Sequence, residues 1–159
     1  NYSQGGNAWN AGSINEVPLE RTAEALATLR RGPLRSGRVG LYGVSRGAEH
    51  ALLLTSLLAK HGLAEPHAVA VHAAPDVICG GFDSREWRDA GDPGWHSWDP
   101  SKRAWSWQGK SDNLLPTTPI EIDHYAGPIF LSHGTADQVW SVAMTRRLEG
   151  RLRAHGRKP

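Results

Sequence analysis

Short apolar runs alternate along the chain with longer stretches in which apolar residues recur at helical spacing. The clearest example begins with Val39, Leu41 and Tyr42, which predict a short buried strand. Directly after it, a mostly apolar series at intervals of three and four residues predicts a helix that ends near residues 60–62: Ala48, Ala51, Leu52, Leu54, Thr55 and Leu58. Only a few residues separate the two patterns, so a tight turn must join strand to helix.

Two further helices are predicted from the same spacing. The first begins at Pro18, which an opening helical turn tolerates, and ends near Arg31 before a Gly-Pro pair. Its inward face is expected to carry Leu19, Ala23, Leu26 and Leu29. The second covers residues 142–155, with Met144, Leu148 and Leu152 facing inward.

Two more apolar runs, at residues 67–73 and 128–133, predict further strands. The resulting order is helix, strand, helix, strand, a long excursion, strand and helix. This alternation is typical of an α/β fold, in which a mostly parallel sheet is flanked by helical crossovers. A length of 159 residues favours a single domain with a proper core.

The excursion at about residues 79–118 has little periodicity but holds five of the seven tryptophans: Trp87, Trp95, Trp98, Trp105 and Trp107. A segment of this length inside a compact domain is typical of a lid or a binding loop. The aromatic rings could line an apolar acyl site, or they could pack the lid itself. The pattern leaves both interpretations open.

The composition of the chain argues against nucleic-acid binding, disulfide bonding and membrane insertion. The formal charge of +2, from 18 basic and 16 acidic residues, is too balanced to indicate a nucleic-acid partner. The single cysteine, Cys79, cannot form an internal disulfide and is expected to be an inert apolar residue. No apolar run approaches the ~20 residues that cross a bilayer, and no secretory leader is visible. We therefore expect a cytoplasmic protein without a membrane partner.

The candidate chemistry lies in the tight turn, where residues 43–47 read Gly-Val-Ser-Arg-Gly. A Gly-x-Ser-x-Gly pattern between strand and helix is typical of a nucleophile elbow, in which the serine hydroxyl is raised on a strained turn. The flanking glycines remove side chains that would collide where helix and strand approach closely. Ser45 is therefore the candidate nucleophile; the alternative is a glycine-rich turn with an idle serine.

An activated serine needs a base, and the base needs an acid to orient it. In folds with this elbow the acid follows the serine in the chain, at the carboxyl end of a strand. Asp137, just after the strand at 128–133, is the favoured candidate, and Asp76, after the strand at 67–73, is its competitor. The structural alternative for Asp137 is a helix N-cap before Val139.

These residues resemble a known family. Residues 43–49 (Gly-Val-Ser-Arg-Gly-Ala-Glu) and 127–141 (Gly-Pro-Ile-Phe-Leu-Ser-His-Gly-Thr-Ala-Asp-Gln-Val-Trp-Ser) resemble the catalytic domain of acyl-CoA thioester hydrolases and bile acid-CoA:amino acid N-acyltransferases. More broadly, the chain is similar to dienelactone hydrolases of the α/β-hydrolase fold. Residues 101–109 and 119–122 resemble the family's middle segment, so the resemblance runs from about residue 17 to residue 156.

The resemblance implies a role for each matching residue. Ser45 would be the nucleophile and Asp137 the triad acid, while the backbone N–H of Arg46 would donate to the oxyanion. A serine at the elbow resembles the hydrolase branch, since the amino-acid-transferring branch is associated with cysteine. The candidate substrate-binding residues are Trp105, Trp107 and Trp140.

Two parts of such a site are not found in the sequence. The second oxyanion donor would come from a loop after an earlier strand, and the triad histidine would follow Pro159. His133, four residues before the acid, and His155, on the last helix, are poor substitutes. We therefore expect a piece of a larger hydrolase, with uncovered edge strands, that is inactive and prone to aggregate by itself.

The sequence thus predicts a serine hydrolase that cleaves a small-molecule ester or an acyl-CoA thioester through an acyl-enzyme, without a cofactor. No metal is expected, because the spacing of Asp92, His96 and Asp99 fits no recognised site. The alternatives are a serine peptidase of the prolyl-oligopeptidase kind and a catalytically inactive hydrolase fold used for binding.

Overall fold

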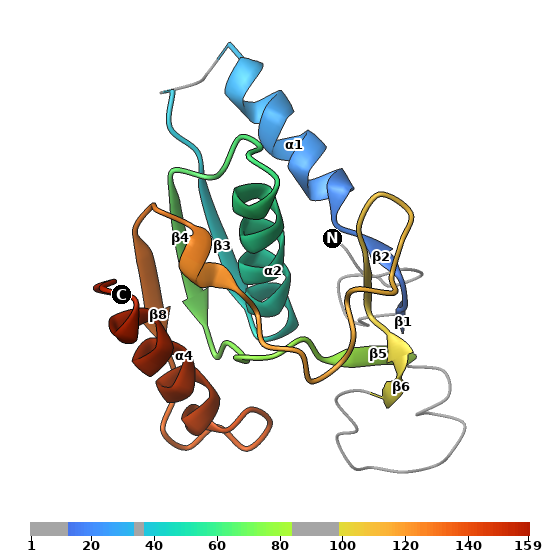
Figure 1. Ribbon diagram of the computed structural model, residues 1–159, viewed down its shortest axis with the longest axis vertical. Helices are drawn as coiled ribbons and strands as arrows, with labels where there is room; N and C mark the ends of the chain where they lie inside the picture. The colour runs from blue at the N-terminus through green and yellow to red at the C-terminus, as the bar shows by residue number, and fades with distance from the viewer. Residues whose placement is uncertain (1–12, 34–36, 84–98) are drawn as a thin grey trace. The chain divides into compact units, whose positions relative to one another are not determined.

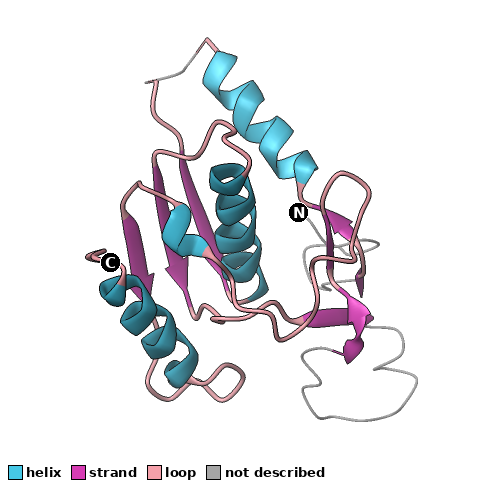
Figure 2. Ribbon diagram, viewed as in Figure 1, coloured by secondary structure: helices cyan, strands magenta, loops and turns pink. Residues whose placement is uncertain are grey.

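The computed structural model describes residues 13–33, 37–83 and 99–159 as a mixed α/β protein (Figure 1; Figure 2). The chain divides into two compact units. The first unit comprises Asn1–Leu19 and Ile78–Thr118, and the second comprises Glu20–Val77 and Pro119–Pro159. The second unit contains both Ser45 and Asp137, so it determines the geometry of the candidate site.

The second unit is built on a three-stranded parallel sheet with the strand order β3-β4-β8. The strands are β3 (Gly40–Val44), β4 (Ala68–His72) and β8 (Ile129–Ser132). Val44 pairs with His72, and His72 pairs with Ser132, so the three strands end side by side. Residues that follow these strands therefore meet at one edge of the sheet.

Three α-helices belong to the described part of this unit: α1 (Glu20–Arg31), α2 (Arg46–Lys60) and α4 (Val142–Ala154). Helix α2 packs against β3 and β4, and the 3-10 turn η1 (Ile122–His124) contacts both α2 and α4 (Figure 1). The predicted inward residues Leu148 and Leu152 of α4 are buried. Their burial, at helical spacing, is what holds this helix on the unit.

The two faces of the sheet differ. Val69 and Val71 of β4 are buried on the face that carries α2. On the opposite face, Tyr42, Ala70 and Phe130 form one row across the three strands, and Tyr42 and Phe130 are 71% and 64% exposed. The prediction that Tyr42 is buried was therefore wrong. Alternate strand residues point to opposite faces, and in the described residues only one face is covered.

This exposed row leads to a prediction about solubility. Phe130→Lys is expected to raise the soluble concentration of the chain while changing the free energy of unfolding by less than about 1 kcal/mol, because the ring is already in water. Absorbance of the solution after centrifugation measures the soluble concentration, and urea unfolding measures the free energy of unfolding. Val71→Lys is the matched control and should prevent folding, because Val71 is buried on the other face. Equal destabilisation by both substitutions would contradict an open face at Phe130.

The start of α1 differs from the prediction. Pro18 belongs to strand β2 (Val17–Pro18), where it pairs with Ser106, and the helix begins at Glu20. Leu26 is buried as predicted, but Leu29 is 61% exposed. Arg30, four residues after Leu26, lies on the same side of the helix as Leu26 and donates to the carbonyl groups of residues 64 and 65.

The first unit contains the Trp-rich excursion, which has more regular structure than its sequence predicts. Its strands are β1 (Ser13–Ile14), β5 (Gly80–Asp83) and β6 (Asp99–Arg103) in one antiparallel sheet, and β2 beside β7 (Trp105–Ser106). A Cβ at Gly80 would lie 1.8 Å from the Asp99 carbonyl oxygen. Glycine thus permits a strand pairing that apolar periodicity does not reveal.

Candidate active site

Ser45 is the single residue that joins β3 to α2. Its φ of 54° is positive and its ψ of −122° lies outside the left-handed helical region, a combination that serine rarely adopts and that stores about 1–3 kcal/mol of strain. Its N–H donates to the His72 carbonyl at 2.9 Å, and its carbonyl accepts from the Ala48 N–H at 2.9 Å. These bonds to β4 and to α2 hold the strained residue in place.

The first glycine of the Gly-x-Ser-x-Gly pattern has a measurable steric role. A Cβ at Gly43 would lie 2.1 Å from the carbonyl oxygen of Gly47 and 2.8 Å from the next backbone nitrogen. Strand and helix therefore approach so closely at the turn that only glycine fits at residue 43. This close approach is typical of a nucleophile elbow, and a glycine-rich turn with an idle serine would show it as well.

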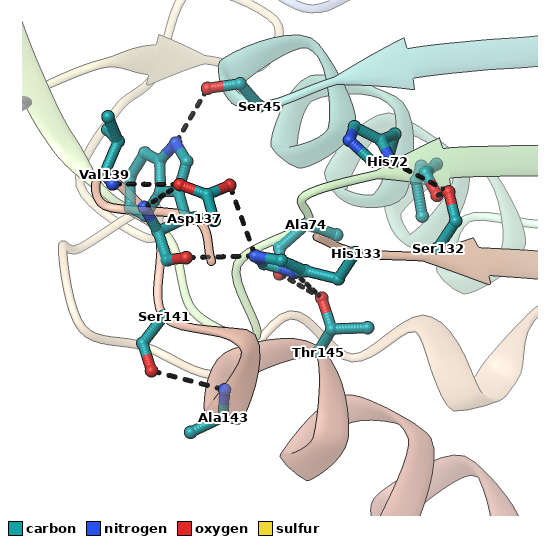
Figure 3. Close-up of polar contacts among 12 residues, drawn as sticks. Ser45, His72, Ala74, Ser132, His133, Asp137, Val139, Ser141, Ala143 and Thr145 are labelled. Carbon is teal, nitrogen blue, oxygen red and sulfur yellow. Dashed lines mark hydrogen bonds and ion pairs between the residues drawn. The ribbon is translucent and has the colours of Figure 1, made fainter. Parts of the chain in front are cut away.

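The Ser45 hydroxyl is held by a residue that also holds Asp137. The indole N–H of Trp140 donates to Ser45 Oγ at 2.7 Å, and the backbone N–H of Trp140 donates to Asp137 Oδ1 at 3.0 Å. Figure 3 shows Ser45 and Asp137 on the same side of the strand ends. The structure thus brings the candidate nucleophile and acid to one edge of the sheet.

Asp137 lies in the loop between β8 and α4. Its Oδ1 also accepts from the Val139 N–H at 2.9 Å. The two hydrogen bonds from the backbone N–H groups of Trp140 and Val139 hold the pKa of Asp137 below its ordinary value, so this group is a carboxylate at neutral pH. No helix begins at Val139, because the N-cap of α4 is Ser141, whose Oγ accepts from the Ala143 N–H. The two bonds that Asp137 accepts, from N–H groups two and three residues ahead, nevertheless follow the capping pattern, so Asp137 caps the turn of its own loop.

His133 packs behind the acid with only 2% of its side chain exposed. Its Nε2 lies 3.0 Å from the Trp140 carbonyl oxygen and 3.4 Å from Asp137 Oδ2. Its Nδ1 lies 2.7 Å from Thr145 Oγ1, and that hydroxyl is 2.9 Å from the Ala74 carbonyl oxygen (Figure 3). Both ring nitrogens therefore face protein groups, and His133 fastens the acid loop to α4.

No histidine in the described ranges contacts the Ser45 hydroxyl. Both nitrogens of His133 are engaged elsewhere, His72 Nδ1 lies 3.0 Å from Ser132 Oγ, and His155 Nδ1 lies 2.9 Å from a carbonyl of α4. The described residues thus present a nucleophile and an acid but place no base between them.

Asp76, the competing acid, is committed to another contact. Its two carboxylate oxygens accept from Nε and one terminal nitrogen of Arg147, at 2.7 Å and 2.8 Å. This bidentate pair is the strong geometry for arginine and carboxylate, and it ties α4 to the segment after β4. The surroundings of Asp76 therefore fit a structural role.

Arg46, the candidate oxyanion donor, is the first residue of α2. The N–H groups of a first helical turn point out of the helix end, which also carries the positive end of the helix dipole. The Arg46 side chain turns to Glu49, whose Oε2 lies 2.9 Å from the guanidinium and which is fully buried. The guanidinium is thus held on the helix by this ion pair.

The three candidate substrate-binding tryptophans are all buried. Trp105 and Trp107 belong to the first unit, and Trp140 of the second unit is 4% exposed. None of the three presents an open aromatic surface. Sequence reasoning missed the bond from Trp140 to Ser45: the Asp-x-x-Trp spacing places the ring near the acid but carries no information about the serine.

Other candidate sites can be examined only where the chain is described. Within these ranges, no group of three or more metal-ligating side chains is arranged around a common point. Asp92 and His96, like Trp87, Trp95 and Trp98, lie outside the described residues. None of the described helices combines the length and the hydropathy of a membrane span.

Comparisons of the chain with protein-family models, with curated proteins and with solved structures found no match.

Proposed function

We propose that this chain supplies the nucleophile and the acid of a serine hydrolase of the α/β-hydrolase fold. The observation that carries the proposal is the backbone of Ser45, a non-glycine residue with φ of 54° on a one-residue turn between a parallel strand and a helix. Strain of this kind concentrates at functional positions, because the surrounding structure must hold it. The acid Asp137 at the same edge of the sheet supports the proposal.

The proposed reaction is acyl transfer to Ser45, followed by hydrolysis of the acyl-enzyme. Ser45 Oγ attacks the carbonyl carbon of an ester or a thioester as a histidine takes its proton, and Asp137 orients that histidine. The resemblance described above implies that this histidine comes after the acid in the chain. The Arg46 N–H stabilises the oxyanion, a contact worth about 3 kcal/mol of barrier. The leaving group departs with a proton, and water then hydrolyses the acyl-enzyme.

The resemblance favours acyl-CoA thioesters as substrates. A thioester and a simple ester pass through the same acyl-enzyme, so the elbow does not separate them. Turnover of CoA thioesters compared with turnover of peptide substrates distinguishes this proposal from a peptidase of the prolyl-oligopeptidase kind.

A fluorophosphonate probe, which reacts with activated serines, tests the proposal on the complete protein. We expect labelling at Ser45, and we expect Ser45→Ala to abolish labelling and turnover while the protein stays folded. Ser132→Ala is the matched control, since Ser132 is another serine at the same edge of the sheet and should not be needed. Turnover retained by Ser45→Ala would defeat the assignment. An unlabelled but folded wild-type protein would favour the binding module.

A further inference from the structure

Trp140 joins three groups of the candidate site. Its indole N–H donates to Ser45 Oγ, its backbone N–H donates to Asp137 Oδ1, and its carbonyl oxygen lies 3.0 Å from His133 Nε2. One residue thus contacts the nucleophile, the acid and the histidine that fastens the acid loop. The relative positions of Ser45 and Asp137 depend on where Trp140 lies.

The chemistry of the indole fits a donor to a nucleophile. The indole nitrogen can donate a hydrogen bond but cannot accept one, so it cannot take the proton of Ser45. A hydroxyl oxygen has two lone pairs and one hydrogen, and Trp140 occupies one lone pair. The hydroxyl hydrogen can still be donated to a base. The contact therefore orients the oxygen without competing with its deprotonation.

The contact should strengthen as the reaction begins. When the base takes the proton, negative charge grows on Ser45 Oγ, and a hydrogen bond to a charged oxygen is about twice as strong as one to a neutral oxygen. Trp140 as a whole is 4% exposed, so little water competes for the bond. The same N–H faces the oxygen again when it leaves the acyl-enzyme.

Trp140 is itself held from behind. His133 Nε2 contacts its carbonyl group, and His133 Nδ1 contacts Thr145 of α4, whose hydroxyl reaches the carbonyl of Ala74. The backbone of Trp140 is therefore attached through His133 and Thr145 to α4 and to the segment after β4. This support fixes the position of the Trp140 backbone, and the burial of the residue restricts the directions that its indole N–H can take.

We propose that Trp140 is a positioning residue, whose indole N–H orients the Ser45 oxygen and stabilises its developing charge while its backbone holds Asp137. The inference rests on the proposed function, and it assigns to Trp140 a role on the nucleophile in place of a role on the substrate.

The first test measures the contact without any activity. Tryptophan indole N–H signals are recorded by ¹H–¹⁵N NMR, and the signal that disappears in Trp140→Phe is assigned to Trp140. We expect Ser45→Ala to shift that signal, because its acceptor is removed, and Ser132→Ala to leave it in place. A signal that Ser45→Ala does not move would overturn the inference, whether or not the protein is a hydrolase.

The second test separates the inference from the proposed function. In the complete protein, Trp140→Phe is expected to lower the maximal rate of fluorophosphonate labelling roughly 10-fold or more, with half-saturating probe concentration unchanged. A Trp140 analogue with sulfur in place of the indole N–H keeps the ring shape and should show the same loss. If wild type is labelled and both variants react at its rate, the inference is overturned and the hydrolase stands. If wild type is not labelled, the hydrolase fails.

Discussion

Replacing Gly43 with alanine is expected to lower the free energy of unfolding by about 3 kcal/mol or more. The new methyl carbon would lie 2.1 Å from the Gly47 carbonyl oxygen, which is a backbone atom, and the position of the methyl carbon is itself fixed by the backbone of residue 43. No side-chain rotation can relieve the overlap, so β3 and α2 must move apart. Urea unfolding of the two proteins measures the loss. Because Ser45 lies within this turn, probe labelling should fall as well.

Gly40→Ala is the matched control for this substitution. Gly40 lies in the same strand, and a Cβ there would have its nearest described neighbour, the Ala68 carbonyl oxygen, at 3.7 Å, an ordinary contact. We expect its stability to stay within about 0.5 kcal/mol of wild type. A Gly43→Ala protein as stable as Gly40→Ala would show that the strand and the helix are not in close contact at the turn.

The second large effect concerns pH. His50 is buried in α2, with Nε2 2.9 Å from Thr22 Oγ1 of α1, and burial lowers its pKa from 6.5 to about 4. The unfolded chain therefore binds a proton between pH 6.5 and pH 4 that the folded chain does not bind. Stability is fully present above pH 6.5 and falls as the pH drops, by about 3 kcal/mol at pH 4.

Urea unfolding at several pH values between 7 and 4 measures this slope. His50→Gln should flatten the profile over this range, because glutamine can still bond Thr22 but does not titrate. His124→Gln, a substitution at an exposed histidine, should keep the wild-type slope. A wild-type profile that His50→Gln leaves unchanged would mean that other groups govern the pH dependence.

Much of the second unit could be predicted from local patterns. The apolar positions of α2 and α4 recur at helical spacing, and the structure confirms both helices and the three strands of the parallel sheet. The predictions that Leu29 and Tyr42 are buried were wrong, because the spacing of apolar residues does not show which of them another element covers. Leu29 is 61% exposed, whereas the next residue, Arg30, contacts the carbonyl groups of residues 64 and 65, and Tyr42 lies on the exposed face of the sheet.

The first unit was the least predictable part. Its described strands are only two to five residues long, too short for a period to be recognised. The pairing of β5 with β6 depends on a close backbone approach at Gly80. The only sequence signal of such a backbone contact is a glycine, and a glycine is equally typical of turns and loops.

For the candidate site, the order of residues alone determined that a strand, a glycine-flanked serine and a helix follow one another. The spacing of apolar side chains and the small size of glycine determine structure within about ten residues of sequence. Both can therefore be recognised in the sequence alone. Only the tertiary structure decided that Trp140, 95 residues after Ser45, donates a hydrogen bond to the Ser45 hydroxyl. It likewise decided that Arg147 pairs with Asp76. Such contacts depend on which strands become neighbours in the sheet, and that pairing is set by the packing of the whole unit.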